Sequence, residues 1–202
     1  MWNRMVFALL EIVAAALFLI PAMALLNRVR FHSVRKTLAY CVFCCYLVAV
    51  YSLVGLPCIT YIRFDINANL IPLLGMRQDL RNSILNVLLF VPLGFLLPLF
   101  WEGYRNWKKT MLFGTSMSLT IECMQMLTMR ATDVNDLITN VLGTCLGYVL
   151  CYFVRKQISG MGRILINRND KDVFLISGIT LVVMFFFQPF PAAYLWDVFL
   201  SG

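Results

Sequence analysis

Six blocks of apolar residues divide this chain, and each is long enough to cross the hydrocarbon core of a bilayer. A helix needs about 17–25 residues to span roughly 30 Å of hydrocarbon. The blocks cover residues 5–26, 38–57, 83–100, 111–128, 135–154 and 173–190. The sequence therefore predicts an all-helical, multi-pass membrane protein in which residues 1–202 form one transmembrane domain of about six helices.

The composition supports a membrane class and argues against nucleic-acid binding. Hydrophobic residues make up 61% of the chain and charged residues only 13%, whereas soluble domains carry about 25% charged residues. The net charge of +7 comes from Lys and Arg clusters between the apolar blocks, where such clusters set the orientation of a membrane protein. No basic face interleaved with aromatic residues occurs, so we expect membrane lipids as partners and no nucleic acid.

Metal and cofactor chemistry find little support in the sequence. Cys41 and Cys44 fit the spacing C-x-x-C, but both lie within an apolar block, and hydrocarbon disfavours the thiolate that binds a metal. The single histidine, His32, lies in a basic connection. No D-x-D or EF-hand spacing of carboxylates occurs. We therefore expect neither a metal ion nor a cofactor.

Basic residues also predict how the helices are oriented. The connections at 27–37, 101–110 and 155–172 contain twelve of the 17 Lys and Arg residues. The positive-inside rule places these three connections in the cytoplasm and both termini outside. We interpret the first block as an uncleaved helix rather than a signal peptide, because Glu11 interrupts it and arginines follow it directly. Trp101, Tyr104 and Trp107 are expected to be anchors at the membrane interface.

The fourth block contains the clearest polar residues inside a predicted span. A charged side chain at the centre of a bilayer costs about 2.5–3.5 kcal/mol on insertion scales, so such residues are functional candidates. Glu122 lies near the end of this block, and Gln125 follows three residues later on the same helical face. Arg130 is eight residues beyond Glu122, which is about 12 Å along a helix. This spacing predicts that Glu122 lies nearer the outer surface than the midplane.

Polar residues also form a stripe at the start of the fifth block. Asp133, Asp136, Asn140, Gly143 and Gly147 are spaced by 3, 4, 3 and 4 residues, and this spacing places them on one face of a helix. The outer part of the stripe is polar. The inner part consists of glycines, which let another helix approach closely.

The third block begins with polar residues too. Asn82 and Asn86 are four residues apart and share a helical face, and Arg81 is adjacent. Pro92 and Gly94 follow, where we expect a kink or a close helix contact. The connection before this block, residues 58–82, is long and partly apolar, and it either lies in the interface or re-enters the membrane.

Because successive spanning helices run in opposite directions, the polar ends of these three helices are expected on one side of the membrane. The positive-inside rule makes this the outer side. The candidate ligand-binding residues are Arg81, Asn82, Asn86, Glu122, Gln125, Arg130, Asp133, Asp136 and Asn140. Glu122, Asp133 and Asp136 are also candidates for a catalytic acid or base. Alternatively, these polar residues only hold the helices together through hydrogen bonds.

Four segments resemble the VanZ-like family of bacterial membrane proteins. Residues 69–72 resemble the family motif ahead of the third helix, and residues 86–94 resemble its pattern N-x-x-x-F-x-P-x-G. Residues 118–125 resemble S-x-x-x-E-x-x-Q, and residues 130–147 resemble R-x-x-D-x-x-D-x-x-x-N-x-x-G-x-x-x-G. Together they cover about residues 67–150, with Leu73 where an aromatic residue is expected. Within them we expect structural roles for Asn69, Pro72, Pro92, Gly94, Gly143 and Gly147.

The resemblance implies a multi-pass protein of the bacterial plasma membrane and cell envelope. The family's namesake is associated with low-level resistance to teicoplanin, a glycopeptide antibiotic that acts at the outer face of this membrane. For this chain we expect an outward-facing polar pocket that binds a lipid-linked cell-wall precursor or a glycopeptide or lipoglycopeptide antibiotic, without catalysis. Two alternatives are an intramembrane transferase or hydrolase that acts on a lipid-linked precursor, and a small transporter or flippase.

Overall fold

The computed structural model describes residues 2–60, 62, 68–69, 80–127, 132–157 and 167–200, with side chains from residue 9 onward and not at 68–69, 132–133 or 199–200. Within these residues the structure is helical apart from two short strands and an isolated bridge, as the sequence predicts. The chain divides into two compact units. Unit 1 contains residues 1–62 and 171–202, and unit 2 contains residues 63–170.

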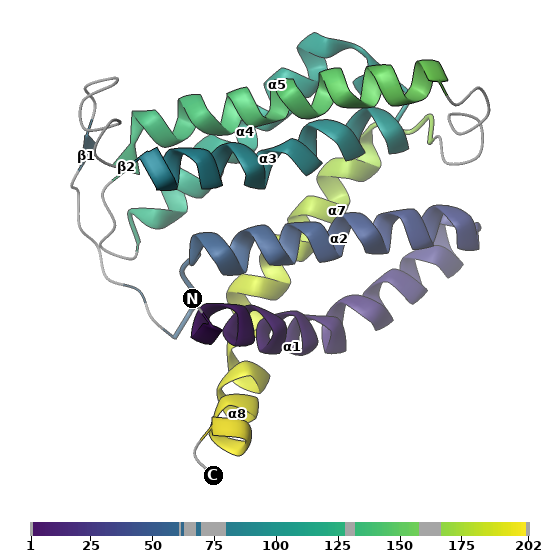
Figure 1. Cartoon of the computed structure of the whole chain (residues 1–202). Coiled ribbons are helices and arrows are strands. Elements are labelled where there is room, and N and C mark those ends of the chain that lie inside the picture. The colour runs from purple at the N-terminus through teal and green to yellow at the C-terminus, as the bar shows by residue number, and fades with distance from the viewer. Residues whose placement is uncertain are drawn as a thin grey trace. The chain divides into compact units, whose positions relative to one another are not determined.

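Unit 1 is built from the first two apolar blocks and the last one. Its elements are α1 (Trp2–Leu26), the π-helical turn η1 (Asn27–Phe31), α2 (Val34–Val54), α7 (Lys171–Val182), the π-helical turn η3 (Val183–Phe187) and α8 (Pro189–Leu200). Helix α1 packs along α2, and α2 packs against α7 (Figure 1). The buried side chains of α2, among them Phe43 and Leu47, form the centre of this unit.

A partly buried ion pair joins the turn between α1 and α2 to the start of α7. The Arg30 guanidinium contacts Asp172 Oδ1 through Nη2 at 2.9 Å and through Nε at 3.0 Å. The Tyr40 hydroxyl donates to Asp172 Oδ2 at 3.3 Å, and Asp172 itself is only 4% exposed. Both carboxylate oxygens of Asp172 are therefore satisfied, which a buried charge requires.

The last apolar block is bent rather than straight. Two segments, Lys171–Phe187 and Pro189–Val198, meet at 54°. Because proline lacks a backbone N–H, Pro189 cannot bond to the Phe185 carbonyl as a helical residue would. The backbone N–H of Ile59 takes this place and donates to the Phe185 carbonyl at 3.0 Å. The segment that follows α2 is therefore attached to the bend by this hydrogen bond.

Unit 2 contains the third, fourth and fifth apolar blocks. Its elements are β1 (Ala68–Asn69), α3 (Leu80–Phe100), the 3-10 turn η2 (Gly103–Arg105), α4 (Trp107–Gln125), β2 (Thr132–Asp133) and α5 (Val134–Gln157). The two strands pair in parallel, with Ala68 opposite Thr132 and Asn69 opposite Asp133. Residues 68–69 of the long connection thus meet the start of α5. Whether the rest of this connection lies in the interface or re-enters the membrane concerns residues that are largely outside the described part of the chain.

Glycines bring α3 and α5 into close contact. A Cβ added at Gly143 or Gly147 would strike the carbonyl oxygen of Val87 or Val91 on α3, and one added at Gly94 would strike that of Thr144 on α5. The lining atoms belong to backbone, so they cannot swing aside as a side chain does. The two helices therefore pack backbone against backbone over about one and a half turns. Pro92 and Pro98 both lie inside α3.

The connection after α3 is tied to residues just before α7. Asn167 bonds through its backbone to Phe100 and Glu102, at 2.8 and 3.0 Å. Trp101, which lies between these two hydrogen-bonded residues, is fully buried, and Tyr104 is only 4% exposed. The interpretation of these two residues as interface anchors is therefore wrong, because their rings are covered by protein. Trp107 is 57% exposed and remains available for such a role.

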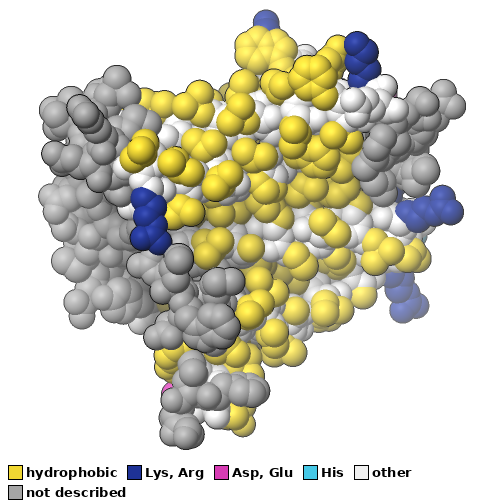
Figure 2. All heavy atoms as spheres, in the orientation of Figure 1, with side chains coloured by type: hydrophobic (Ala, Val, Ile, Leu, Met, Phe, Trp, Pro, Cys, Tyr) yellow, Lys and Arg dark blue, Asp and Glu magenta, His cyan; other side chains and the backbone are white. Residues whose placement is uncertain are grey.

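Four helices of the described chain are long and apolar enough to cross a membrane, or five if the bent pair counts as one span. The four are Leu9–Phe31, Val34–Val54, Leu80–Phe100 and Val134–Gln157. Helix α4 is not among them, because it carries two lysines in its first turn and Ser, Thr and Glu residues along its length. Hydrophobic side chains dominate the surface visible in Figure 2, as expected for a protein surrounded by lipid.

Candidate functional site

The start of α3, the end of α4 and the start of α5 lie at one end of unit 2, beside strands β1 and β2 (Figure 1). This is the arrangement that alternating helix directions predict. Every predicted ligand-binding residue belongs to one of these three helix ends or to the connection between α4 and α5. We refer to this region as the polar end of unit 2.

Helix α4 turns its polar face toward the interior of unit 2. Ser118, Glu122 and Gln125 are spaced so that they share one face, and their residues are 0%, 4% and 6% exposed. Phe113, Met117 and Ile121 are buried beside them, and Leu112 and Leu119 at the edge of this face are 69% and 47% exposed. The opposite face carries Ser116 and Thr120, whose exposed hydroxyls donate to carbonyl oxygens of the same helix at 2.8 Å each. Helix α4 thus buries its carboxyl and amide side chains among apolar ones and satisfies its exposed hydroxyls within the helix.

A hydrogen bond joins this face to α5. The Asn140 amide nitrogen Nδ2 donates to the Ser118 hydroxyl oxygen at 2.9 Å, and both residues are buried. The other end of the same amide, Asn140 Oδ1, is buried and accepts no hydrogen bond from the described part of the chain. A buried carbonyl oxygen without a donor costs about 1–3 kcal/mol. Asn140 is therefore an acceptor available to a guest molecule or a water.

The buried face at the start of α5 is shifted from the predicted stripe. Asn135 and Thr139 are 4% and 2% exposed, and the Thr139 hydroxyl donates to the Asn135 and Asp136 carbonyl oxygens at 3.0 Å each. Asp136 is only half-buried. It lies in the first turn of α5, where the positive end of the helix dipole stabilises a carboxylate. The sequence pattern missed Asn135, Thr139 and the partner role of Ser118, although Asn135 and Thr139 are four residues apart, a spacing that places them on one helical face.

The residues predicted at the start of α3 are less enclosed than those of α4 and α5. Arg81 and Asn82 are exposed and Asn86 is half-buried. Ser83, which the sequence analysis did not select, is buried. The polar end thus has an enclosed part on α4 and α5 and a more accessible part on α3.

Several predicted residues have no described side chain. Arg130 and Pro72 lie outside the described residues, and Asn69 and Asp133 are described only by their backbones. The pairing of Asn69 with Asp133 nevertheless joins the motif ahead of α3 to the start of α5. Among the residues with described side chains, no group of three or more His, Cys, Asp and Glu is arranged to hold a metal ion.

Comparison with known proteins shows which family this sequence matches. The sequence model of the VanZ/LLP1 family matches residues 37–155, from the first turn of α2 to the end of α5. Neither the curated proteins nor the solved structures yield a match to this chain. The matched range includes every residue of the polar end and the glycine contacts between α3 and α5.

Proposed function

This chain belongs to the VanZ/LLP1 family, and we propose that its polar end binds the headgroup of a lipid-linked envelope molecule or a glycopeptide-type antibiotic at the outer leaflet. The observation that carries the proposal is the buried polar face formed by Ser118, Glu122, Gln125 and Asn140. Polar side chains enclosed within apolar helices mark functional sites more often than structural ones.

The residue types suit a ligand rich in hydroxyl and amide groups. Asn140 Oδ1 offers an acceptor, and the Glu122 carboxyl offers further acceptors from a buried position. Arg81 lies at the accessible side of the polar end, where a guanidinium matches phosphate or carboxylate groups. Sugar headgroups, lipid phosphates and glycopeptides all present these groups.

We also propose six spans, with both termini outside and the polar end facing out. Helix α4 would be the additional span, because Glu122 and Gln125 are covered by protein and its exposed hydroxyls bond to carbonyl oxygens of the same helix. The Arg30–Asp172 pair supports the orientation, since it brings two of the basic connections to the same end of unit 1. We further propose the bacterial plasma membrane as its location, which membership of the VanZ/LLP1 family supports.

Resistance measurements test the binding proposal. The chain is expressed in a susceptible bacterium and the inhibitory concentration of teicoplanin is measured, with membrane abundance determined in parallel. We expect the chain to raise this concentration, and we expect Glu122→Gln to abolish the gain at unchanged abundance. Glu102→Gln is the matched control, because Glu102 is an exposed carboxylate on a connection away from the polar end. Full resistance in the Glu122→Gln strain at normal abundance contradicts the assignment.

A catalytic role is the second candidate, and the burial of Glu122 is the observation that favours it. A carboxyl enclosed beside hydroxyl and amide groups suits a general acid or base for transfer or hydrolysis of a lipid-linked precursor. Purified protein with such a precursor distinguishes the two functions. Turnover that is lost in Glu122→Gln while precursor binding is retained favours the enzyme, whereas binding without turnover in the unaltered protein favours the binding role.

A further inference from the structure

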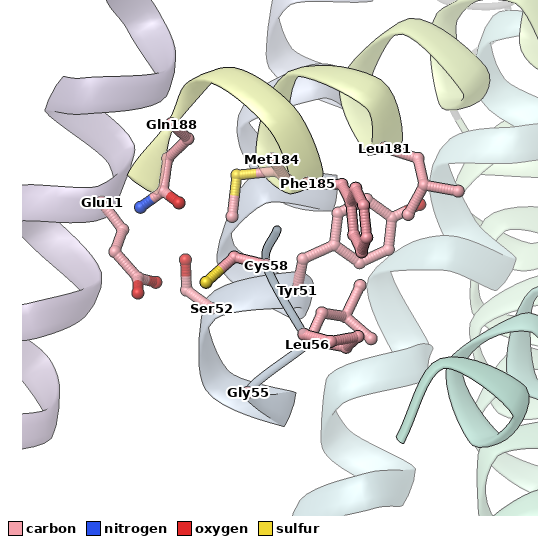
Figure 3. Close-up of a pocket in the computed structure, with 11 residues that line it drawn as sticks. Glu11, Tyr51, Ser52, Gly55, Leu56, Cys58, Leu181, Met184, Phe185 and Gln188 are labelled. Atoms are coloured by element: carbon pink, nitrogen blue, oxygen red, sulfur yellow. The ribbon is translucent and has the colours of Figure 1, made fainter. Parts of the chain in front are cut away.

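A second enclosed polar site lies in unit 1, far along the chain from the residues of the polar end. It is a cavity of ≈ 60 Å³ between α1, the end of α2 and the bend after η3. Its polar lining residues are Glu11, Ser52, Cys58 and Gln188, and Met184 and Phe185 supply apolar walls (Figure 3). In the sequence, Glu11 stands out only as an interruption of the first apolar block.

Gln188 points into this cavity from the bend between η3 and α8. Its side chain lies on the side of Glu11 and Ser52 in Figure 3, and the residue is only 5% exposed. Among the described residues, the side-chain amide of Gln188 makes no hydrogen bond. Its backbone N–H donates to Val183, and its backbone carbonyl accepts from Ala192. The Ser52 hydroxyl is also buried and interacts with the Glu11 carboxyl. The Gln188 amide, the Ser52 hydroxyl and the Glu11 carboxyl thus face one small cavity.

The cavity has one carboxyl and no cationic side chain. Glu11 is the only carboxylic acid among its lining residues, and none of them is Lys, Arg or His. Glu11 also borders an adjacent cavity of ≈ 220 Å³ that Asp197 and Trp196 line. The carbonyl end of α7 and η3 points toward the bend, and the C-terminal end of a helix carries partial negative charge. A cation therefore gains favourable electrostatic energy in this cavity.

The size of the cavity limits what it can hold. A volume of ≈ 60 Å³ corresponds to about two water molecules, so a lipid headgroup does not fit. Carboxylate, hydroxyl and amide oxygens are ligands for hard cations. The lining contains a single carboxylate, which balances one positive charge, whereas divalent sites usually combine several carboxylates. A small monovalent cation satisfies both limits.

We propose that Glu11, Ser52 and Gln188 form a binding site for a small monovalent cation, of the size of Na⁺, at the bend in unit 1. Discontinuous membrane helices hold such ions by combining side-chain oxygens with the carbonyl ends of a helix break. Here the break is the 54° bend at Gln188, and the carboxylate comes from α1. The site is independent of the polar end and of the function proposed for it.

Chemical labelling of the purified full chain in detergent tests the proposal. An apolar carbodiimide reacts with carboxyls in membrane segments, and a bound cation shields the carboxylate that holds it. We expect Na⁺ to slow labelling of the Glu11 peptide several-fold at fixed pH and ionic strength, with choline as the balancing ion. The Glu122 peptide serves as an internal reference whose labelling stays unchanged. Equal protection by choline overturns the proposal.

Variants and thermal stability provide the second measurement. A ligand that binds only the folded state raises its melting temperature, so we expect Na⁺ to raise the melting temperature of the unaltered chain but not that of Glu11→Gln. Ser52→Ala and Gln188→Leu should shift the protecting Na⁺ concentration upward. Ser177→Ala is the control, because Ser177 also has a buried hydroxyl but does not line the cavity. Labelling and melting that both ignore Na⁺, or a Ser177→Ala shift as large as that of Ser52→Ala, overturn the proposal.

Discussion

Asn140 on α5 donates a hydrogen bond to the Ser118 hydroxyl on α4 over 2.9 Å, and both residues are buried in unit 2. Polar contacts of this kind between membrane helices contribute about 0.6 kcal/mol on average and at most about 1.7 kcal/mol. The bond therefore aligns two helices at the polar end while contributing modestly to stability. The measured strength of this hydrogen bond shows whether it mainly aligns the two helices or mainly stabilises the fold.

A double-mutant cycle makes that measurement. We expect Asn140→Ala and Ser118→Ala each to lower the free energy of unfolding, and the double variant to lower it by about 0.6–1.7 kcal/mol less than the sum. Thermal or denaturant unfolding of the purified protein in detergent reports the values. Ser116 on the same helix is the control, because it is exposed and bonds to its own helix at Leu112. Additive effects for Asn140 and Ser118 would show that the two side chains are not coupled.

Backbone contact between α3 and α5 predicts that added methyl groups are costly. A Cβ at position 143 also meets the Phe90 Cβ and the Val87 carbonyl carbon at 3.0 Å each. We expect Gly143→Ala to reduce stability by about 1–3 kcal/mol, since backbone must shift to admit the methyl group. The matched variant is Gly178→Ala on α7, where a Cβ has nothing within 4 Å. That variant should be neutral or gain up to about 1 kcal/mol, and a Gly143→Ala protein as stable as Gly178→Ala contradicts the packing.

The ion pair in unit 1 predicts a further stability difference. Asp172→Asn keeps the shape of the side chain but removes the charge that holds Arg30 and accepts from Tyr40. We expect a loss of about 1–3 kcal/mol, typical of a hydrogen bond to a charged group. Lys109→Ala removes the ammonium of the more exposed Lys109–Asp170 pair, whose atoms lie 3.1 Å apart, and should change stability by less than about 1 kcal/mol. Equal losses in the two variants would show that the burial of Asp172 does not strengthen its pair.

Tyr104 predicts how stability depends on alkaline pH. Burial, and secondarily the Asp170 carboxylate, raises the pKa of this phenol above its ordinary value of 10.0. The folded state therefore keeps the proton at pH values where the unfolded chain loses it. The resulting stabilisation is complete below about pH 10 and is lost as the pH rises through the folded-state pKa.

Melting temperatures in detergent between about pH 8 and pH 11 test this dependence. Tyr104→Phe retains the ring packing and should show a shallower loss of melting temperature at the alkaline end. Tyr194→Phe removes a phenol that is 69% exposed, and its profile should follow that of the unaltered chain. An unchanged slope in Tyr104→Phe would assign the alkaline loss to other groups.

Much of the helical framework follows from local sequence. Each of the six apolar blocks is helical, and the family that its motifs resemble is confirmed. Block length is a strong signal, because a bilayer imposes it on every span. The number of spans is less evident: α4 buries Glu122 and Gln125 within the protein, and an average over its residues counts them as if they were exposed.

The parts that the sequence did not predict depend on long-range contacts. Trp101 and Tyr104 have the composition of an interface anchor, yet residues 167–170 cover their segment. Strand β2, which leads directly into α5, pairs with β1 of a distant segment, and in the first turn of α5 Asn135 is buried rather than Asp136. The bend at Pro189 is visible in the sequence, but its bond to Ile59 is not, because more than a hundred residues separate them.

The inward polar face of α4 also bears on how the protein is made. Ser118 and Glu122 are synthesised before Asn140 and the rest of α5, so α4 leaves the ribosome without the partner that covers its polar side. A lone α4 would present a carboxyl and several hydroxyls to lipid, which the bilayer disfavours. On the six-span topology proposed above, entry of α4 into the membrane has to be concerted with that of α5, as a hairpin rather than as two successive segments. Chains truncated between the two helices should leave α4 outside the hydrocarbon, and these residues are then constrained by biogenesis as well as by any ligand.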